Sequence, residues 1–268
     1  MCFGDNTIDR YVDPVGADFV GGSCVNVAVG LAGQKIDTAY VGPVGDDAAG
    51  SAIVAELRAH GVDVSRVGIV AGGGTAVTEI ELLPNGDRRF ISESYELIDD
   101  YKPDADTWSF VVAARHVHTS RFPHLLDRLR CAPSRSFRLS CDFSTWEPPT
   151  DLSGVDLAFL SIDPAEGEQR ARALATETRE RGAGEAVVTL GEHGSLAASG
   201  DEIVFQPALP AVVVDTCGAG DAFIAAYIAR WLAGARVGER LAAGAQAGAR
   251  ACAALGAFPQ LRSSARVA

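Results

Sequence analysis

Short apolar runs rich in valine and isoleucine alternate along this chain with alanine-rich stretches of helical period. Such runs suit strands that are covered on both faces, and parallel strands need a crossover, usually a helix, between them. The alternation therefore predicts an α/β fold in which helices cover a mainly parallel sheet. The expected helices are Ser23–Gly33, Ala48–His60, Glu166–Arg181, Ala219–Leu232 and Leu241–Leu255. The expected strands include Thr38–Val41, His116–Thr119, Phe137–Cys141, Leu157–Leu160, Ala186–Leu190 and Ser195–Ala198.

Two stretches, Arg10–Val20 and Thr75–Ser92, do not follow this alternation. The second alternates across a turn at Pro84-Asn85-Gly86, which is typical of a β-hairpin. A hairpin with little helix beside it has to cover something or pair with a partner. We therefore expect segments at about 10–21 and 75–92 to form a small lid within a single domain of residues 1–268. Unpaired edges on such a lid indicate a homodimer in which two lids protect one another.

The charge balance of the chain bears on its partners. The 23 basic and 35 acidic residues give a net charge of −12, which would repel nucleic acid and anionic membranes. A small molecule fits this balance better. ATP is not excluded, because helix N-termini and bound cations can reverse the potential inside a cleft.

The cysteines and the N-terminal sequence bear on location. The 6 cysteines form no C-x-x-C pair and have no metal-ligand spacing, so we expect reduced thiols. The start, MCFGDNTIDRY, does not resemble a signal peptide, and no apolar run approaches the ~20 residues of a membrane span. These features predict a cytoplasmic protein that neither crosses a membrane nor binds one.

The segment Val212–Gly234 carries the clearest chemical signal. A β-branched run ends at Asp215-Thr216, glycines then permit a tight turn, and the sequence from Ala219 onward has the composition of a helix. The backbone N–H groups of Gly218, Ala219, Gly220 and Asp221 would be the unpaired donors of a helix N-terminus. Small side chains would let a phosphate approach them closely. The segment therefore predicts an anion site.

The carboxylate of Asp221 at this place has two interpretations. It could stabilise the helix N-terminus by about 0.3–1 kcal/mol. It could instead be a base beside an anion hole, an arrangement suited to phosphoryl transfer because the base orients the attacking hydroxyl and takes its proton. The chain has no G-x-x-x-x-G-K-[ST] motif, and no G-x-G-x-x-G opens a helix after the first strand, so neither a P-loop nor a dinucleotide fold is expected.

The sequence D-T-C-G-A-G-D from Asp215 to Asp221, followed by an apolar helix, resembles the C-terminal signature of the PfkB carbohydrate kinases. Gly21 to Ser51 is similar to the N-terminal signature of that family, and the likeness extends to the GAFP sequence near Ala257. The resemblance implies a ribokinase-like three-layer α/β/α fold with a small β lid. It implies ATP and Mg²⁺ as cofactors and leaves a monovalent cation open. It favours Asp221 as the catalytic base, with Gly218, Ala219 and Gly220 at the phosphate.

The resemblance also implies a sugar site. In the family, an Asp at the end of the first strand and a GG-x-x-x-N turn hold the sugar hydroxyls, and the matching residues here are Asp9, Gly22 and Asn26. Paired acceptors and donors suit a polyol, and small residues let its ring lie close. The structural alternatives are that Asn26 caps or turns the backbone and that Asp9 is a solvated loop acid.

Two further elements of the family would hold the nucleotide and its metal. The N-x-x-E element reads Asp163-Pro164-Ala165-Glu166 here, with Asp in place of Asn, and it implies Asp163 and Glu166 near magnesium. Glu166 could instead stabilise the first turn of a helix. The strand and turn at Val187–Ala198 imply nucleotide contacts at Thr189, Gly191 and Gly194, together with Thr216. A strand, a glycine turn and a second strand also form ordinary hairpins.

Some pairs of polar residues are better explained by a structural role than by metal binding or catalysis. His116 and His118 would share one face of a strand, but no other ligand completes a metal site, so we interpret them as polar residues at a strand end. Asp46-Asp47 and Asp99-Asp100 are most simply solvated turns.

The acceptor is the least constrained part of the function. Strings such as VGDD, GVDVS, DRRF and CDFSTW are similar to those of family members that phosphorylate C6 of fructoselysine, so this or a related fructosamine is the expected acceptor. Fructose, 2-keto-3-deoxygluconate, ribose or a nucleoside are alternative acceptors on the same machinery. A non-catalytic sugar- or nucleotide-binding protein is the alternative of another class.

Overall fold

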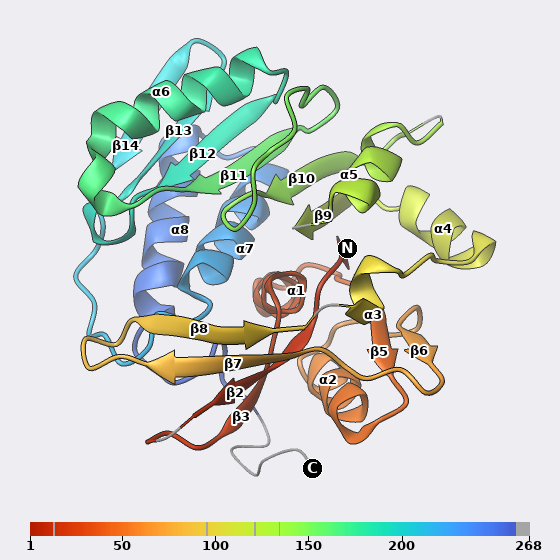
Figure 1. Ribbon diagram of the computed structural model, residues 1–268. Coiled ribbons are helices and arrows are strands. Elements are labelled where there is room, and N and C mark those ends of the chain that lie inside the picture. The colour runs from red at the N-terminus through yellow and green to blue at the C-terminus, as the bar shows by residue number, and fades with distance from the viewer. Residues whose placement is uncertain (13, 95, 121, 134, 261–268) are drawn as a thin grey trace.

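An eight-stranded sheet organises the protein in the computed structural model, which describes residues 1–260 except 13, 95, 121 and 134 (Figure 1). The strand order is β14-β13-β12-β11-β10-β9-β1-β4. Strands β4 to β12 of this order run parallel, whereas β13 and β14 are antiparallel to their neighbours. The bounds are β1 (Cys2–Phe3), β4 (Tyr40–Val41), β9 (His116–Ser120), β10 (Arg138–Asp142), β11 (Leu157–Ser161), β12 (Glu185–Thr189), β13 (Ser195–Ser199) and β14 (Glu202–Gln206).

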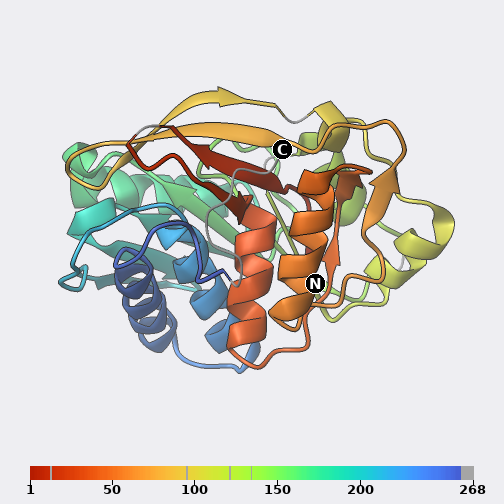
Figure 2. The same cartoon turned by 90° about the horizontal axis from the view of Figure 1, so that it is seen from below.

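Helices cover both faces of this sheet. One layer contains α8 (Val237–Ala251), α7 (Ala219–Leu232), α1 (Ser23–Gly33) and α2 (Ala48–Ala59), which lie side by side in Figure 2. The other face is covered by α4 (Ala105–Val112), α5 (Pro123–Arg130) and α6 (Gly167–Glu180), while the short α3 (Glu96–Asp99) lies near the lid.

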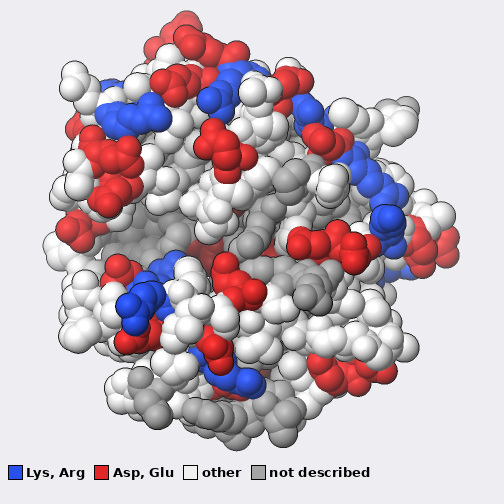
Figure 3. Space-filling model, in the orientation of Figure 1, with Lys and Arg blue, Asp and Glu red and all other residues white. Residues whose placement is uncertain are grey.

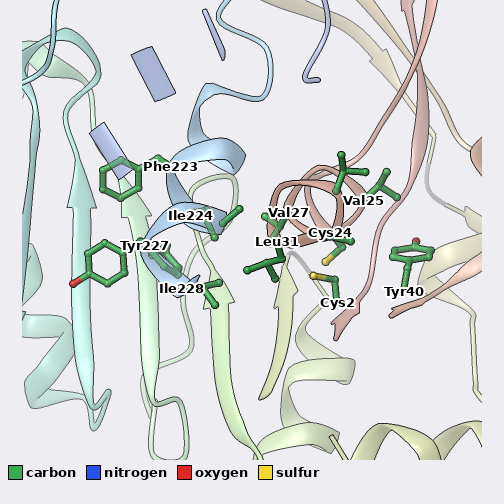
Figure 4. Packing of buried hydrophobic residues seen from close by; sticks show 14 of the residues in the cluster. Cys2, Cys24, Val25, Val27, Leu31, Tyr40, Phe223, Ile224, Tyr227 and Ile228 are labelled. Carbon is green, nitrogen blue, oxygen red and sulfur yellow. The ribbon is translucent and has the colours of Figure 1, made fainter. Parts of the chain in front are cut away.

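Alternating residues of each strand separate two apolar cores. Phe159 and Val187 belong to the core under α1 and α7, whereas Leu160 and Val188 belong to the opposite core. Figure 4 shows Leu31 of α1 between that helix and the side chains of α7. Burial on both faces explains why these strands are almost wholly apolar. The predicted three-layer α/β/α fold is confirmed.

The two stretches that broke the alternation form one mixed sheet, the lid sheet, with the order β3-β2-β7-β8. Its strands are β2 (Thr7–Tyr11), β3 (Asp18–Gly21), β7 (Val77–Leu82) and β8 (Arg88–Glu93). The turn between β7 and β8 is closed by the N–H of Leu83 donating to the carbonyl of Asp87 at 2.7 Å. The predicted hairpin is therefore confirmed. A separate two-stranded sheet pairs β5 (Pro43–Gly45) with β6 (Gly68–Val70).

Several boundaries differ from those predicted. Helix α8 begins at Val237 rather than Leu241, because the Glu239 carboxylate accepts from the N–H of Arg236 and caps an earlier turn. Helix α6 begins at Gly167, after the 3₁₀ turn η1 (Pro164–Glu166). The central strand β1 covers only Cys2–Phe3, so Asp9, expected at the end of the first strand, lies in β2 of the lid sheet instead.

All six cysteines are free. Within the described part of the chain, no helix is both long enough and apolar enough to span a membrane.

Candidate active site

The N-terminal ends of α1 and α7 meet at the carboxyl edge of the central sheet, on the side that faces the lid sheet (Figure 1). Asn26, on the first turn of α1, donates through Nδ2 to Oδ2 of Asp221 at 2.8 Å. Asp221 lies on the first turn of α7. The structure thus brings together two residues that the sequence assigned to different roles, the sugar contact and the base.

The carboxyl group of Asp221 is half-buried. Burial raises its pKa to about 6, although the hydrogen bond from Asn26 acts in the opposite direction. A carboxyl group with a pKa in this range is ionised at neutral pH and is still basic enough to accept a proton.

The turn before α7 has the features of an anion site. Gly218 has φ 72°, a left-handed conformation, and no side chain caps the helix. The N–H of Ala219 donates to the carbonyl of Thr216, but the N–H groups of Gly220 and Asp221 find no acceptor among the described residues. A Cβ added at Gly220 would meet no atom within 4 Å, so the space beside these donors is open. Of the predicted donors, the N–H groups of Gly220 and Asp221 therefore remain available to a ligand in the described structure, whereas that of Ala219 is used within the turn.

The sugar-site residues of the prediction lie close to this turn but in different surroundings. Asp9 is 5 % exposed in β2, which does not support its alternative interpretation as a solvated loop acid. Its burial raises the pKa to about 8, against the lowering effect of the Arg88 charge. Gly22 has φ 98°, and a Cβ there would meet Cα of Asn6 at 2.5 Å, so the backbone itself requires glycine.

Two buried carbonyl oxygens near this region lack protein partners. Oδ1 of Asn26 and Oδ1 of Asn6 are buried and accept no hydrogen bond from any described residue. A buried polar atom without a partner is costly, so a ligand or a water is expected to donate to each. Hydroxyl groups of a polyol would serve this purpose.

Four residues that sequence reasoning missed complete the surroundings. Asp5 fixes the start of α1, since its carboxylate accepts from the N–H groups of Ser23 and Cys24 at 2.6 and 3.0 Å. Asp142 ends β10, and burial raises its pKa to about 7, with the charge of Asp221 adding to the rise. From the lid sheet, Tyr11 donates to Asp215 and Arg88 donates to Thr216, both in the segment that leads into α7. Only Asp142 had a sequence signal, because it directly follows a predicted parallel strand.

Asp163 and Glu166 lie together in a capping box at η1. Asp163 accepts from the N–H of Ala165 at 2.8 Å, and Glu166 accepts from the N–H of Asp163 at 3.2 Å. Both side chains are exposed. Each carboxylate keeps a second oxygen without a protein partner in the described structure, and such oxygens suit magnesium or its water ligands. No cluster of three or more His, Cys, Asp or Glu side chains capable of holding a metal occurs among the described residues.

The predicted nucleotide contacts follow the carboxyl end of β12. Thr189 ends that strand, and the glycines at 191 and 194 flank the 3₁₀ turn η2 (Gly191–His193) with φ of 50° and 121°. His193 Nδ1 lies 3.0 Å from the carbonyl of Pro164, so this turn is adjacent to the capping box of Asp163. Thr216 belongs to another segment, where its N–H donates to the carbonyl of Gly86 at the lid tip at 3.0 Å.

The histidine pair and the acidic turn also have clear surroundings. His116 Nε2 and His118 Nδ1 both lie within hydrogen-bonding distance of Ser140 Oγ, at 2.9 and 2.8 Å, inside the sheet. This shared hydroxyl accounts for the pair without a metal. Asp47 is more than a solvated turn, because it caps α2 through Gly50 and also accepts from the N–H of Thr75 at 2.8 Å.

Figure 3 shows a hollow between the β7–β8 hairpin and the part of the molecule above it, with acidic side chains along its border.

Several known proteins are similar to this chain. The model of the pfkB family carbohydrate kinases matches residues 16–135 and 152–262. Fructoselysine 6-kinase of Escherichia coli (strain K12) is 34% identical over 235 residues, which cover 86% of this chain and 88% of that protein. Fructokinase of Klebsiella pneumoniae is 30% identical over 257 residues, covering 84% and 82%.

The fold comparison agrees with these matches. The structure of Arabidopsis thaliana ribokinase complexed with ribose and ATP superposes with a TM-score of 0.81 at 23% identity, covering 96% of this chain and 93% of the other. The family match spans most of the chain and includes Asn26 and Asp221. This chain belongs to the pfkB family of carbohydrate kinases, and it is a phosphotransferase.

Proposed function

We propose that this kinase transfers the γ-phosphoryl group of ATP to a sugar hydroxyl that Asp221 deprotonates. The carboxylate of Asp221 takes the proton of the hydroxyl, and the hydroxyl oxygen forms a bond to the γ-phosphorus. The bond between that phosphorus and the bridging oxygen breaks, and ADP leaves with its electron pair. The open N–H groups of Gly220 and Asp221 would stabilise the charge on the phosphoryl oxygens.

The observation that carries this proposal is the hydrogen bond from Asn26 to Asp221 beside the open turn. A carboxylate that only stabilised its own helix would not need a partner from another helix. Asn26 keeps Oδ1 free of protein partners in the described structure, so the same side chain can orient the base and accept a hydrogen bond from the sugar. The acceptor hydroxyl would therefore be held beside its base.

Magnesium would lie at Asp163 and Glu166 and offset the charge of the phosphates. Thr189, Gly191 and Gly194 would contact the nucleotide, because their turn adjoins this capping box. The metal is tested by titrating turnover with Mg²⁺ in the parent and in Glu166→Gln, which should need more Mg²⁺ for half-maximal rate. A monovalent cation could act as an additional activator. Measuring turnover in K⁺ salts and in choline salts tests this.

For the acceptor we propose C6 of fructoselysine or a related fructosamine. The similarity to fructoselysine 6-kinase supports this choice. Asp9, Asp142 and Asp221 all have raised pKa values, and the charge of Asp5 contributes to each rise. Of these three, Asp221, with a pKa of about 6, is the one that is mainly charged at neutral pH, and its carboxylate beside the acceptor disfavours an anionic sugar acid and suits a neutral sugar with a cationic tail.

The acids of the lid hairpin contribute less to this choice. Glu81 is paired with Arg89, and Glu79 accepts a hydrogen bond from Ser92 at 2.9 Å, so their charges are partly compensated. Glu93 also has an interaction partner. The preference for a cationic tail therefore rests mainly on the charge of Asp221.

The test compares kcat/KM for fructoselysine, fructose, 2-keto-3-deoxygluconate and ribose under one set of conditions, with the product position determined by NMR. We expect fructoselysine to be preferred and to be phosphorylated at C6. A tenfold preference for fructose or for the sugar acid, about 1.4 kcal/mol in transition-state binding, would contradict the fructosamine assignment. The assignment as a kinase would still stand. No acceptor-dependent consumption of ATP would instead favour a non-catalytic binding protein.

We also propose a homodimer through the lid sheet. Strand β8 is an edge strand, and Ile91 on it is 52 % exposed. An apolar residue on an open edge favours pairing with a second copy. Sedimentation analysis should show a dimer for the parent and a monomer for Ile91→Lys, and a monomeric parent would contradict the proposal.

A further inference from the structure

The tip of the β7–β8 hairpin is attached to the phosphate turn through Thr216. Arg88, the first residue of β8, donates through Nη1 to both the carbonyl oxygen and Oγ1 of Thr216 at 3.1 Å. The N–H of Thr216 donates to the carbonyl of Gly86, and its hydroxyl donates to Asp87 at 3.2 Å. These contacts place the guanidinium of Arg88 next to the motif that carries Asp221.

Arg88 has donors that these contacts do not use. Its Nε is buried and has no acceptor among the described residues, although a guanidinium carries five N–H donors in a fixed plane. The neighbouring Arg89 differs in both respects, because it is 68 % exposed and paired with Glu81. A buried charged donor without an acceptor is costly, so its position suits a ligand that brings the acceptor.

The charge of Arg88 acts on the two acids that flank the acceptor site. It lowers the pKa of Asp9 and that of Asp221, in both cases against the larger effect of burial. Arg88 nevertheless forms no ion pair with either carboxylate within the described part of the chain. The guanidinium is thus close enough to act on the acids electrostatically but is not neutralised by contact with them.

We propose that Arg88 is a further catalytic residue, whose guanidinium donates to the oxygens of the phosphoryl group while it passes to the acceptor. This inference rests on the proposed function. The new O–P bond forms, the bond to the leaving ADP oxygen breaks, and the proton goes to Asp221, while Arg88 stays protonated throughout. A planar guanidinium matches phosphate oxygens with two parallel donors and stabilises charge that is spread over them.

The test compares Arg88→Met, Arg88→Lys and Arg88→Ala with the matched control Arg89→Met. We expect kcat to fall by roughly 10² or more in Arg88→Met with KM for ATP changed only a few fold. Arg88→Lys should retain an intermediate rate, and Arg89→Met should resemble the parent. In Arg88→Ala, guanidinium at concentrations well below those that unfold the protein should restore part of the rate.

The pH profile separates a catalytic role from an anchoring role. Because Arg88 lowers the pKa of Asp221, the acid limb of kcat/KM should move to higher pH in Arg88→Met. A loss of rate that guanidinium does not restore, with the acid limb unmoved, would assign Arg88 to anchoring the lid and overturn the proposal. A loss confined to anionic acceptors would assign it to the acceptor and overturn it as well.

A further variant separates this proposal from the proposed function. If Arg88→Met turned over like the parent while Asp221→Asn was inactive, only the role of Arg88 would fail. If both variants turned over like the parent, the proposed function itself would fail.

Discussion

The amide nitrogen of Asn26 lies 2.8 Å from the carboxylate of Asp221 and donates a hydrogen bond to it across the contact between α1 and α7. Under the proposed function, this bond would couple the position of the acceptor to that of the base. Because it stabilises the charged form of Asp221, it also sets the pH at which the base becomes available.

Replacing Asn26 should therefore shift the pH dependence of the reaction. The base must be ionised, so kcat/KM falls as the pH drops through the pKa of Asp221, which is about 6. Asn26→Ala removes a contact that lowers this pKa, so the acid limb should move to higher pH. The measurement is a pH profile of kcat/KM from pH 5 to 9 for the parent and the variant. An acid limb at the same or lower pH would show that the hydrogen bond does not tune the base.

The two glycines of the phosphate turn should respond differently to a side chain. A Cβ at Gly220 meets no protein atom within 4 Å, so Gly220→Val should keep most of the stability and lose activity because its side chain occupies the place proposed for the phosphate. Gly218→Ala combines φ 72° with a Cβ at 2.4 Å from Ala257, and should lose about 1–3 kcal/mol of stability. Thermal unfolding and turnover of both variants check this contrast. A folded, fully active Gly220→Val would place the phosphate elsewhere.

In the ligand-free protein, the carboxyl group of Asp142 should lower the free energy of unfolding at high pH. Its pKa of about 7 in the folded protein lies above the ordinary value of 3.8, so folding favours the protonated form. The sign follows from linkage: this group costs stability as the pH rises from about 4 through 7, and the cost is largest above pH 7.

Asp142→Asn removes that cost and can still accept from Ser144 through Oδ1. At pH 8 the free energy of unfolding of the variant should exceed that of the parent by about 1 kcal/mol or more, so the variant should unfold at a higher temperature. The difference should be smaller at pH 5 and should disappear only near pH 4. Thermal unfolding at both pH values is the measurement, and an equal difference at the two would show that charge is not the cause.

Local sequence patterns predicted the elements of the fold better than the contacts of the site. The bounds of α1 and α7 agree with those expected, because a glycine turn and an alanine-rich stretch define both helices locally. The predicted start of α8 was wrong, because the start depends on a capping pair, Arg236 and Glu239, whose geometry the composition does not reveal.

Contacts between distant segments explain what the sequence could not predict about the site. Asn26 and Asp221 are 195 residues apart, and Arg88 and Thr216 are 128 residues apart. The motifs predicted the first two as functional residues, but only the packing of α1 against α7 shows that they touch. Arg88 lies in a hairpin without a recognisable motif, and its role depends on where the tip of that hairpin is attached.

Asp221→Asn tests the central claim most directly, because it keeps the shape of the side chain and removes the base. Turnover of ATP with the acceptor, and nucleotide affinity by calorimetry, are measured on the parent and the variant. We expect kcat to fall by roughly 10² or more, with nucleotide affinity unchanged within a few fold. A variant that turned over like the parent would contradict the assignment of Asp221 as the base.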